Sequence, residues 1–215
     1  MLRAASGSVV PLLLASASPR RRELLGLIGV RFVVVVSRFD ESALLSEATD
    51  PVSYVQAAAR GKAEDVAVRR AGVVLGVDTD VVGPEGRILG KPANADEAKK
   101  MLRSLSGRTH SVYSGIALLR SEAGRVVQRE EVIVETRVTF AELPQSAIEA
   151  YVATGEPIDK AGAYAIQGGA LPFVSKIEGD LASVIGLPLA ALCTMLPRFG
   201  VALWNAASSL SNEGI

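Results

Sequence analysis

An apolar run that passes directly into a basic helix start constrains the fold more than any other stretch of this chain. Residues 12–25 have the sequence LLLASASPRRRELL. The apolar run over residues 9–15 predicts a buried strand, and Pro19 suits the first turn of a helix, where its missing N–H is not needed. Ser18 is expected to cap this helix, because a serine hydroxyl can accept a backbone N–H that lacks a partner within the helix. The stretch therefore predicts a strand–turn–helix unit.

Three arginines, Arg20, Arg21 and Arg22, stand in the first turn of the predicted helix. Positive charge at this end opposes the helix dipole, which favours an anion there. Backbone N–H groups, the hydroxyls of Ser16 and Ser18, and guanidinium groups would together suit a phosphate chain. Phosphate binding would relieve the conflict, and the alternative is a solvated basic turn.

Further apolar segments alternate with helical patterns along the chain. Strands are predicted for residues 32–36, 73–77, 111–119, 126–140 and 173–177, the first two being valine-rich runs that suit burial on both faces. Helices are predicted for residues 19–28, 51–70, 94–105, 142–152 and 188–196. The two longest strands predict an antiparallel hairpin. The order of elements predicts an α/β fold with a mixed, partly antiparallel sheet flanked by helices.

Composition and charge exclude several classes of site. The 23 Lys and Arg balance the 23 Asp and Glu, so nothing draws the whole chain to nucleic acid, and an anion site must be local. The single cysteine, Cys193, and the single histidine, His110, exclude an intrachain disulfide and a zinc site built on those residue types. We expect Cys193 to be a core thiol and His110 a structural hydrogen-bonding group. A required divalent cation would sit on carboxylates, which suits Mg²⁺ or Mn²⁺.

The chain length favours a single domain over residues 1–215, organised as two lobes, with frayed tails at residues 1–8 and 205–215. The longest apolar candidate for a membrane span, residues 186–204, is interrupted by prolines and an arginine. The sequence therefore predicts a protein with no membrane partner.

Polar clusters follow predicted strand ends or lie in loops rich in glycine and proline. They are residues 16–22, Asp40 with Glu41, Asp78 with Thr79, Lys91 with Pro92, and residues 159–167. Gathered in one cleft, they would offer cations for phosphates, carboxylates for a metal and an amide for a nucleobase edge. Taken singly, each cluster also has a purely structural interpretation, such as a helix cap for Asp78 and Thr79.

Several motifs together give the chain a family resemblance. The stretches ASASPRRRELL, GVDTDVV, ILGKP, LSGRTHSVYSG, EPIDKAGAYAIQGG and VIGLPL, in that order over about residues 12–196, resemble the Maf-like nucleoside triphosphate pyrophosphatases. The resemblance implies a mixed α/β fold of the Maf and ITPase type, with two lobes around a central cleft, and a cytoplasmic location. It also implies a divalent metal cation and hydrolysis of a nucleoside triphosphate to the monophosphate and pyrophosphate. It leaves a homodimer open.

The resemblance implies roles for single residues. Asp78 falls on the family's general base, and Glu41 and Asp78 fall on charged positions suited to hold the metal. Arg20, Thr79 and Gln167 fall on positions that mark substrate choice, and they resemble the branch acting on dTTP and UTP. The residues expected to bind phosphate are Ser16, Ser18, Arg20, Arg21, Lys62, Lys91 and Lys160. Because the Gln167 amide offers both a donor and an acceptor, it would match the O4 and N3–H edge shared by uracil and thymine.

Two positions depart from the family pattern, and two other functions stay open. Asp80 is an additional acid on the same side of a strand as Asp78, where it would either bind the metal or be solvated. Ser183 replaces a usual asparagine. The alternative functions are a nucleotide-binding regulator of septum formation with little turnover, and a pyrophosphatase acting on 7-methyl-GTP. The presence of Asp78, Glu41 and Lys91 favours an enzyme, since a protein that only binds has no need of a base.

Overall fold

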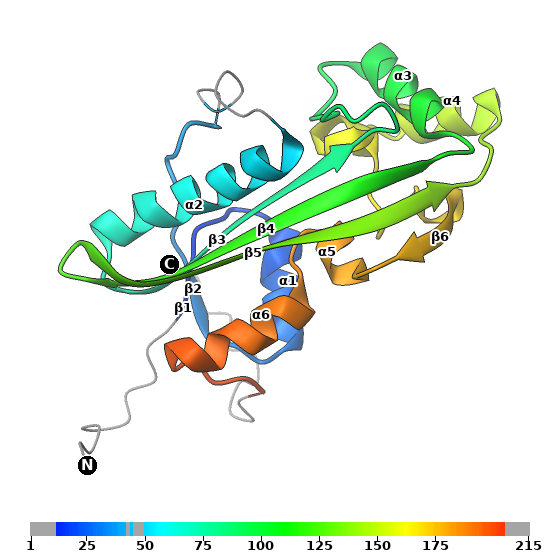
Figure 1. Cartoon of the computed structure of the whole chain (residues 1–215). Coiled ribbons are helices and arrows are strands. Elements are labelled where there is room, and N and C mark those ends of the chain that lie inside the picture. The colour runs from blue at the N-terminus through cyan, green and yellow to red at the C-terminus, as the bar shows by residue number, and fades with distance from the viewer. Residues whose placement is uncertain (1–11, 42–43, 45–49, 205–215) are drawn as a thin grey trace.

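The computed structural model describes residues 12–41, 44 and 50–204. The predicted start of the first strand at Val9 and the predicted frayed tails lie outside the described residues. A six-stranded sheet with the order β2-β1-β3-β4-β5-β6 runs through the molecule (Figure 1). The strands are β1 Leu12–Leu14, β2 Phe32–Val34, β3 Gly72–Val82, β4 Thr109–Glu122, β5 Arg125–Phe140 and β6 Val174–Glu178.

Helices flank this sheet on both faces. They are α1 Pro19–Leu27, α2 Pro51–Arg69, α3 Ala95–Leu105, α4 Gln145–Ala153, α5 Leu181–Ile185 and α6 Leu189–Met195, with short 3₁₀ turns at Glu156–Asp159, Ala161–Ala163, Leu171–Phe173 and Leu196–Phe199. Figure 1 shows α2 over one face, α1, α5 and α6 over the other, and α3 and α4 at the far end of the hairpin. No helix in the described part of the chain combines the length and hydropathy needed to cross a membrane.

The sheet is mixed, as the sequence predicted. β1 runs parallel to both β2 and β3, whereas β3, β4, β5 and β6 pair antiparallel in succession. The predicted hairpin is confirmed as β4 and β5, and its turn places Ala123 and Gly124 at positive φ. The α/β class with a partly antiparallel sheet flanked by helices is therefore confirmed.

Two glycines let α2 lie close to the middle of the sheet. A Cβ added at Gly76 of β3 would stand 2.1 Å from the backbone oxygen of Ala59, and one at Gly115 of β4 would stand 3.0 Å from that of Val55. Both helix residues are buried. This close contact fixes α2, and with it Lys62, over the strand that carries Asp78.

Three apolar clusters fill the space between sheet and helices. One packs under α1 and α6 around Leu12, Leu75 and Phe199, and a second fills the end covered by α3 and α4 around Phe140. The third lies beneath α2 around Ala63. Cys193, predicted to be a core thiol, is half-buried and packs against the first cluster.

Several predicted strand ends differ from the structure, and two of these differences bear on the sheet and the site. The strand predicted over residues 32–36 ends at Val34 and lies at the sheet edge, where Val33 is 50% exposed, so the prediction of burial on both faces was wrong. Apolar composition does not distinguish an edge strand from a central one. The strand predicted to end at Val77 continues to Val82, because its pairing with β4 is unbroken from Gly72 to Val82. Asp78 therefore lies within a strand and not beyond its end.

Candidate active site

The site lies where one edge of β3 opens. On that edge, Ala15 of the chain leaving β1 donates to the carbonyl of Leu75, and Leu89 donates to the carbonyl of Val81, both at 2.8 Å. Between these two bonds, residues 78–80 border a cavity of about 720 Å³. That volume is typical of a small-molecule site.

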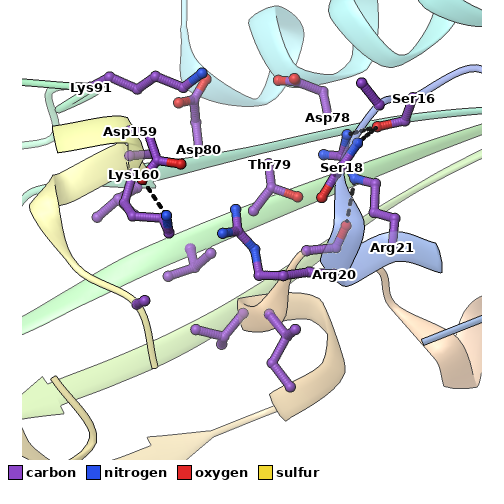
Figure 2. Close-up of a pocket in the computed structure, with 18 of the residues that line it drawn as sticks. Ser16, Ser18, Arg20, Arg21, Asp78, Thr79, Asp80, Lys91, Asp159 and Lys160 are labelled. Carbon is purple, nitrogen blue, oxygen red and sulfur yellow. Dashed lines mark hydrogen bonds and ion pairs between the residues drawn. The ribbon is translucent and has the colours of Figure 1, made fainter. Parts of the chain in front are cut away.

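Residues from both faces of β3 reach the same cavity because it wraps around this open edge. Side chains alternate along a strand, so Asp78 and Asp80 point to one face and Thr79 points to the other. Figure 2 shows the two carboxylates on one side of β3 and Thr79 on the other, with Arg20 below Thr79. All four residues line the cavity.

The carboxylate face is organised by a lysine from α2. Nζ of Lys62 lies 2.6 Å from Oδ1 of Asp78 and 2.9 Å from Oε1 of Glu41. The Asp78 side chain is only 8% exposed, and its second oxygen, Oδ2, is buried and has no hydrogen-bond partner among the residues that the structure describes. One oxygen of Asp78 is thus held in place, and the other keeps lone pairs that no described donor uses.

Asp80 adds a further acid to this face. Its burial, together with the negative charges of Asp78 and Glu41, raises the pKa of Asp80 to about 7. The nearby cations Lys62 and Lys91 oppose this shift without cancelling it. Asp80 therefore keeps its proton more readily than a solvated carboxyl does.

These carboxylates suit a hard divalent cation. The described ranges bring together no set of three or more His, Cys, Asp or Glu side chains that would hold a metal by themselves. Mg²⁺ commonly takes one or two carboxylates and completes its shell with water and substrate phosphates. The carboxylates of Asp78 and Glu41, both bonded to Lys62, match that donor set.

A buried guanidinium group faces the carboxylates from the start of α1. Nε of Arg21 donates to the carbonyl of Gly186 at 3.0 Å, and Nη1 donates to Oγ of Ser16 at 2.8 Å. Burial lowers the pKa of Arg21, although the negative charge of Asp78 opposes the shift. Arginine stays protonated despite such shifts, so this group keeps a fixed positive charge in the cavity.

The helix cap predicted at Ser18 is wrong in detail. Ser18 occupies the N-cap position, but its side chain makes no capping hydrogen bond. Its backbone N–H instead donates to Oγ of Ser16 at 3.3 Å, and the residue lines the cavity. The first turn of α1 thus keeps its N–H groups for an anion.

The remaining basic groups stand on the opposite wall. Lys160 pairs with its neighbour Asp159, and Lys91 lies near Asp80 (Figure 2). Gln167 is exposed and lines the rim. The cavity lining includes every residue that the sequence nominated: Ser16, Ser18, Arg20, Arg21, Glu41, Lys62, Asp78, Thr79, Lys91, Lys160 and Gln167.

Comparison with known proteins shows the family of the chain. The family model described as Maf-like protein matches residues 11–199. The chain belongs to the Maf family.

Curated relatives of this Maf chain share nearly half of its aligned residues. A dTTP/UTP pyrophosphatase from Moorella thermoacetica is 49% identical over 90% of this chain and 97% of its own length. Proteins of the same name from Myxococcus xanthus and Symbiobacterium thermophilum are 48% and 46% identical, over 91% and 92% of this chain and 96% and 98% of their own. A solved structure of a HAM1 protein from Coxiella burnetii is 19% identical with a TM-score of 0.49, covering 88% of this chain and 99% of that one. That last likeness is too low to support a functional statement.

Sequence reasoning missed one residue at the base of the Maf cavity. Oγ of Ser114 lies 2.7 Å from Oγ1 of Thr79 and donates to the carbonyl of Ser183 at 2.8 Å. Ser114 is fully buried in an otherwise apolar stretch of β4. A serine within the alternating pattern of the LSGRTHSVYSG motif was the available signal.

The structural role predicted for His110 of this Maf chain is confirmed. Its Nε2 lies 2.9 Å from the hydroxyl of Tyr164, whose ring lines the cavity. The imidazole packs edge-on against Phe140 and is 2% exposed. Burial lowers the pKa of His110 to about 4, which keeps the ring neutral near pH 7.

Proposed function

We propose that this chain hydrolyses dTTP and UTP to the nucleoside monophosphate and pyrophosphate. The three curated relatives carry the name dTTP/UTP pyrophosphatase and align over nearly their full length. The observation that carries the chemical part of the proposal is the buried Oδ2 of Asp78, which has no hydrogen-bond partner among the described residues and belongs to a side chain lining a cavity that also holds fixed positive charge.

Binding of the triphosphate is assigned to the start of α1 and the opposite wall. Arg20 and Arg21 offer planar forks of donors that match phosphate oxygens, and Lys91 and Lys160 act as compact charges. Ser16 and Ser18 add polar groups beside the N–H groups of the first helical turn. Lys62 is bound to two carboxylates in this structure, so a phosphate contact from it stays a prediction.

A divalent cation is assigned to Asp78 and Glu41. When bound, it would lower the pKa of water and neutralise charge on the phosphates. Lys62 now lies between the two carboxylates and holds them at a fixed separation from each other. The nature of the metal, Mg²⁺ or Mn²⁺, is part of the proposal.

Asp78 is assigned as the general base. Its Oδ1 is held by Lys62, so Oδ2 is the atom that accepts a proton from water. The deprotonated water attacks the α-phosphorus, the bond from that phosphorus to the bridging oxygen breaks, and pyrophosphate leaves. Arg21, which already faces Asp78, stabilises the negative charge that accumulates on the phosphates.

The location and assembly of the protein belong to the same proposal. A cytoplasmic enzyme would meet the nucleotide pool directly, and a homodimer is the assembly to be checked by light scattering. The zero formal net charge favours a free nucleotide over a nucleic acid as the substrate.

Pyrophosphate release from a nucleotide panel tests the proposal. Purified protein with Mg²⁺ or Mn²⁺ is given dTTP, UTP, CTP, ATP, GTP and 7-methyl-GTP. We expect selective release from dTTP and UTP, lost in Asp78→Asn. Preference for 7-methyl-GTP would reject the substrate assignment, and tight nucleotide binding without any release would favour a regulator.

A further inference from the structure

The register of the sheet places two hydroxyls directly opposite each other beneath the cavity. Thr79 of β3 pairs with Ser114 of β4, so both side chains point to the same face of the sheet. Their oxygens lie 2.7 Å apart, and Ser114 Oγ lies 2.8 Å from the carbonyl oxygen of Ser183 in α5. The three oxygens form a chain from the cavity into the core.

Counting hydrogens fixes the direction of this chain. A carbonyl oxygen carries no hydrogen, so Ser114 must donate its only hydroxyl hydrogen to Ser183. Ser114 Oγ can then only accept from Thr79, which uses the only hydroxyl hydrogen of Thr79. Ser114 is 0% exposed, so water does not compete for these bonds.

The Thr79 hydroxyl can therefore only accept a hydrogen bond from a ligand, because its own hydrogen is donated to Ser114. It is half-buried and lines the cavity. A Cβ added at the adjacent Gly186 would stand 3.9 Å from Thr79 Oγ1, and Gly186 has a φ of +129°, which disfavours any other residue there. The glycine keeps the space beside the Thr79 oxygen free of a side chain.

The wall around Thr79 suits a nucleobase. Val81 follows Thr79 on the same face of β3, and Val112 shares the Ser114 face of β4. These valines line the cavity together with Val184 and Ile185 of α5. The carboxylates Asp78 and Asp80 point to the opposite face of β3, away from this apolar wall. A ring with one polar edge fits an apolar wall that carries a single placed acceptor.

We infer that Ser114 is a positioning residue that holds Thr79 as a hydrogen-bond acceptor for the N3–H of uracil or thymine, in place of the Gln167 amide that the sequence paired with this group. This inference rests on the proposed function and refines its choice of base. Uracil and thymine present a donor at N3 between two carbonyl acceptors. Cytosine presents an acceptor at N3, so its lone pair would face that of Thr79.

The test compares kcat/KM for UTP and CTP in wild type, Ser114→Ala and Thr79→Val. Without Ser114, the Thr79 hydroxyl can rotate and donate to cytosine. We expect Ser114→Ala to lower the UTP/CTP ratio about 10-fold, the usual value of one hydrogen bond. In the Thr79→Val background, adding Ser114→Ala should leave the ratio unchanged, because Ser114 acts only through Thr79.

Ser121→Ala is the matched control. Ser121 is also a buried serine of β4 whose hydroxyl donates to a backbone carbonyl, that of Ala67 at 2.6 Å, and it lies outside the cavity lining. The UTP/CTP ratio of kcat/KM in Ser121→Ala should stay at the wild-type value. Equal loss of UTP and CTP turnover in Ser114→Ala, or a further fall of the ratio in the Thr79→Val background, would overturn the inference.

Two measurements on the wild-type protein remain decisive if Ser114→Ala does not fold. 3-Methyl-UTP, which lacks the N3–H, should be at least about 10-fold poorer than UTP, and equal turnover would reject the inference. Absence of turnover with every nucleotide would reject the proposed function instead. Calorimetry with the α,β-methylene analogues of UTP and CTP would then decide, since the inference requires tighter binding of the uracil compound and equal affinities would reject it.

Discussion

In the proposed mechanism, Asp78 meets two requirements of a general base with a single carboxylate. Lys62 holds one oxygen at 2.6 Å, and the other oxygen is buried and open. A base must be fixed in position and still have a free lone pair, and here different oxygens of one side chain meet these needs. The sequence located Asp78 by its motif, but the pairing with Lys62 depends on how α2 packs on β3.

Replacing Asp78 tests this division of roles. Asp78→Asn keeps the size of the side chain and removes its basicity, so we expect kcat to fall about 10²- to 10⁴-fold. Steady-state pyrophosphate release measures it. Glu131→Gln is the control, because Glu131 is also a largely buried, ion-paired carboxylate but lies outside the cavity lining. A similar loss of kcat in Glu131→Gln would mean that neutralising any buried, ion-paired carboxylate lowers kcat, and it would contradict a special role for Asp78.

Ionisation of Asp80 at high pH should lower the free energy of unfolding of the metal-free protein. Its pKa rises from 3.8 in the unfolded chain to about 7 in the folded state because of burial and the neighbouring Asp78 and Glu41. The folded state therefore binds more protons between these values, and stability falls as pH rises through this window. With EDTA at pH 8, Asp80→Asn should gain about 1 kcal/mol or more, which is about 2–4 °C in Tm.

The pH dependence provides the control for this variant. Well below pH 3.8, Asp80 is protonated in both states, so the Tm difference between wild type and Asp80→Asn that is expected at pH 8 should disappear. Equal Tm values at pH 8 would contradict the shifted pKa.

At the scale of elements, the contact between α2 and β3 brings the site together. Lys62 reaches Asp78 because α2 lies against the sheet at Gly76 and Gly115. The same two strands, β3 and β4, also place Thr79 opposite Ser114. The glycines at these two positions therefore allow both the packing of α2 on the sheet and the contact between Lys62 and Asp78.

A methyl group at Gly76 should disturb this contact. Gly76→Ala places a Cβ 2.1 Å from the Ala59 oxygen and 2.8 Å from the Ala63 Cβ, and neither can move without shifting α2. We expect a loss of about 1–3 kcal/mol in the free energy of unfolding, the usual cost of overpacking. Urea denaturation measures it.

Gly26→Ala is the matched control for Gly76→Ala. Gly26 lies in α1 and has no atom within 4 Å of an added Cβ. Alanine is the better helix former, so this change should be neutral or stabilising. A Gly76→Ala protein as stable as the wild type would mean that α2 has room to adjust.

The order of elements could largely be predicted, and their ends less well. Periodicity identified the helices α2 and α3 and the hairpin of β4 and β5, because long segments carry strong patterns. Position in the sheet could not be predicted for β2, since valines suit both a central strand and an exposed edge. The end of β3 was placed too early, because two aspartates look like a strand end unless the pairing with β4 is known.

At the scale of the whole molecule, a single histidine links the cavity to the acid stability of the fold. His110 is 2% exposed and contacts both Tyr164 and the second apolar cluster through Phe140. Protonation of this ring would place a charge in the core next to a wall of the cavity. Protonation of His110 at acidic pH should therefore lower the free energy of unfolding.

The pH dependence of stability has a defined window. Burial lowers the pKa of His110 from 6.5 to about 4, so the unfolded chain binds the proton more readily between these values. The full contribution is present above pH 6.5 and is lost as pH falls towards 4, about 3 kcal/mol in all. Denaturant unfolding at several pH values measures it, and His110→Gln, which cannot titrate, should show a flatter profile. Parallel profiles would contradict this prediction.

The residues of the site could be predicted as a set, but not their pairings. Every nominated residue lines the cavity because each motif brings its own polar group to a neighbouring position in the fold. The bonds that set their chemistry join distant segments, as in Arg21 with Gly186 and Thr79 with Ser114. Such bonds depend on strand register and helix packing, which a single sequence does not specify.

Because one edge of β3 is unpaired beside the cavity, residues on both of its faces reach the same cavity while the backbone separates them. The two faces can therefore change independently in evolution. In the proposed mechanism Asp78 on one face takes part in hydrolysis, and in our inference its neighbour Thr79 on the other face takes part in the choice of base. A substitution that alters base preference need not disturb the carboxylates, because the backbone stands between them. A new substrate range would thus be reachable through a few changes on one face, with catalytic power preserved on the other.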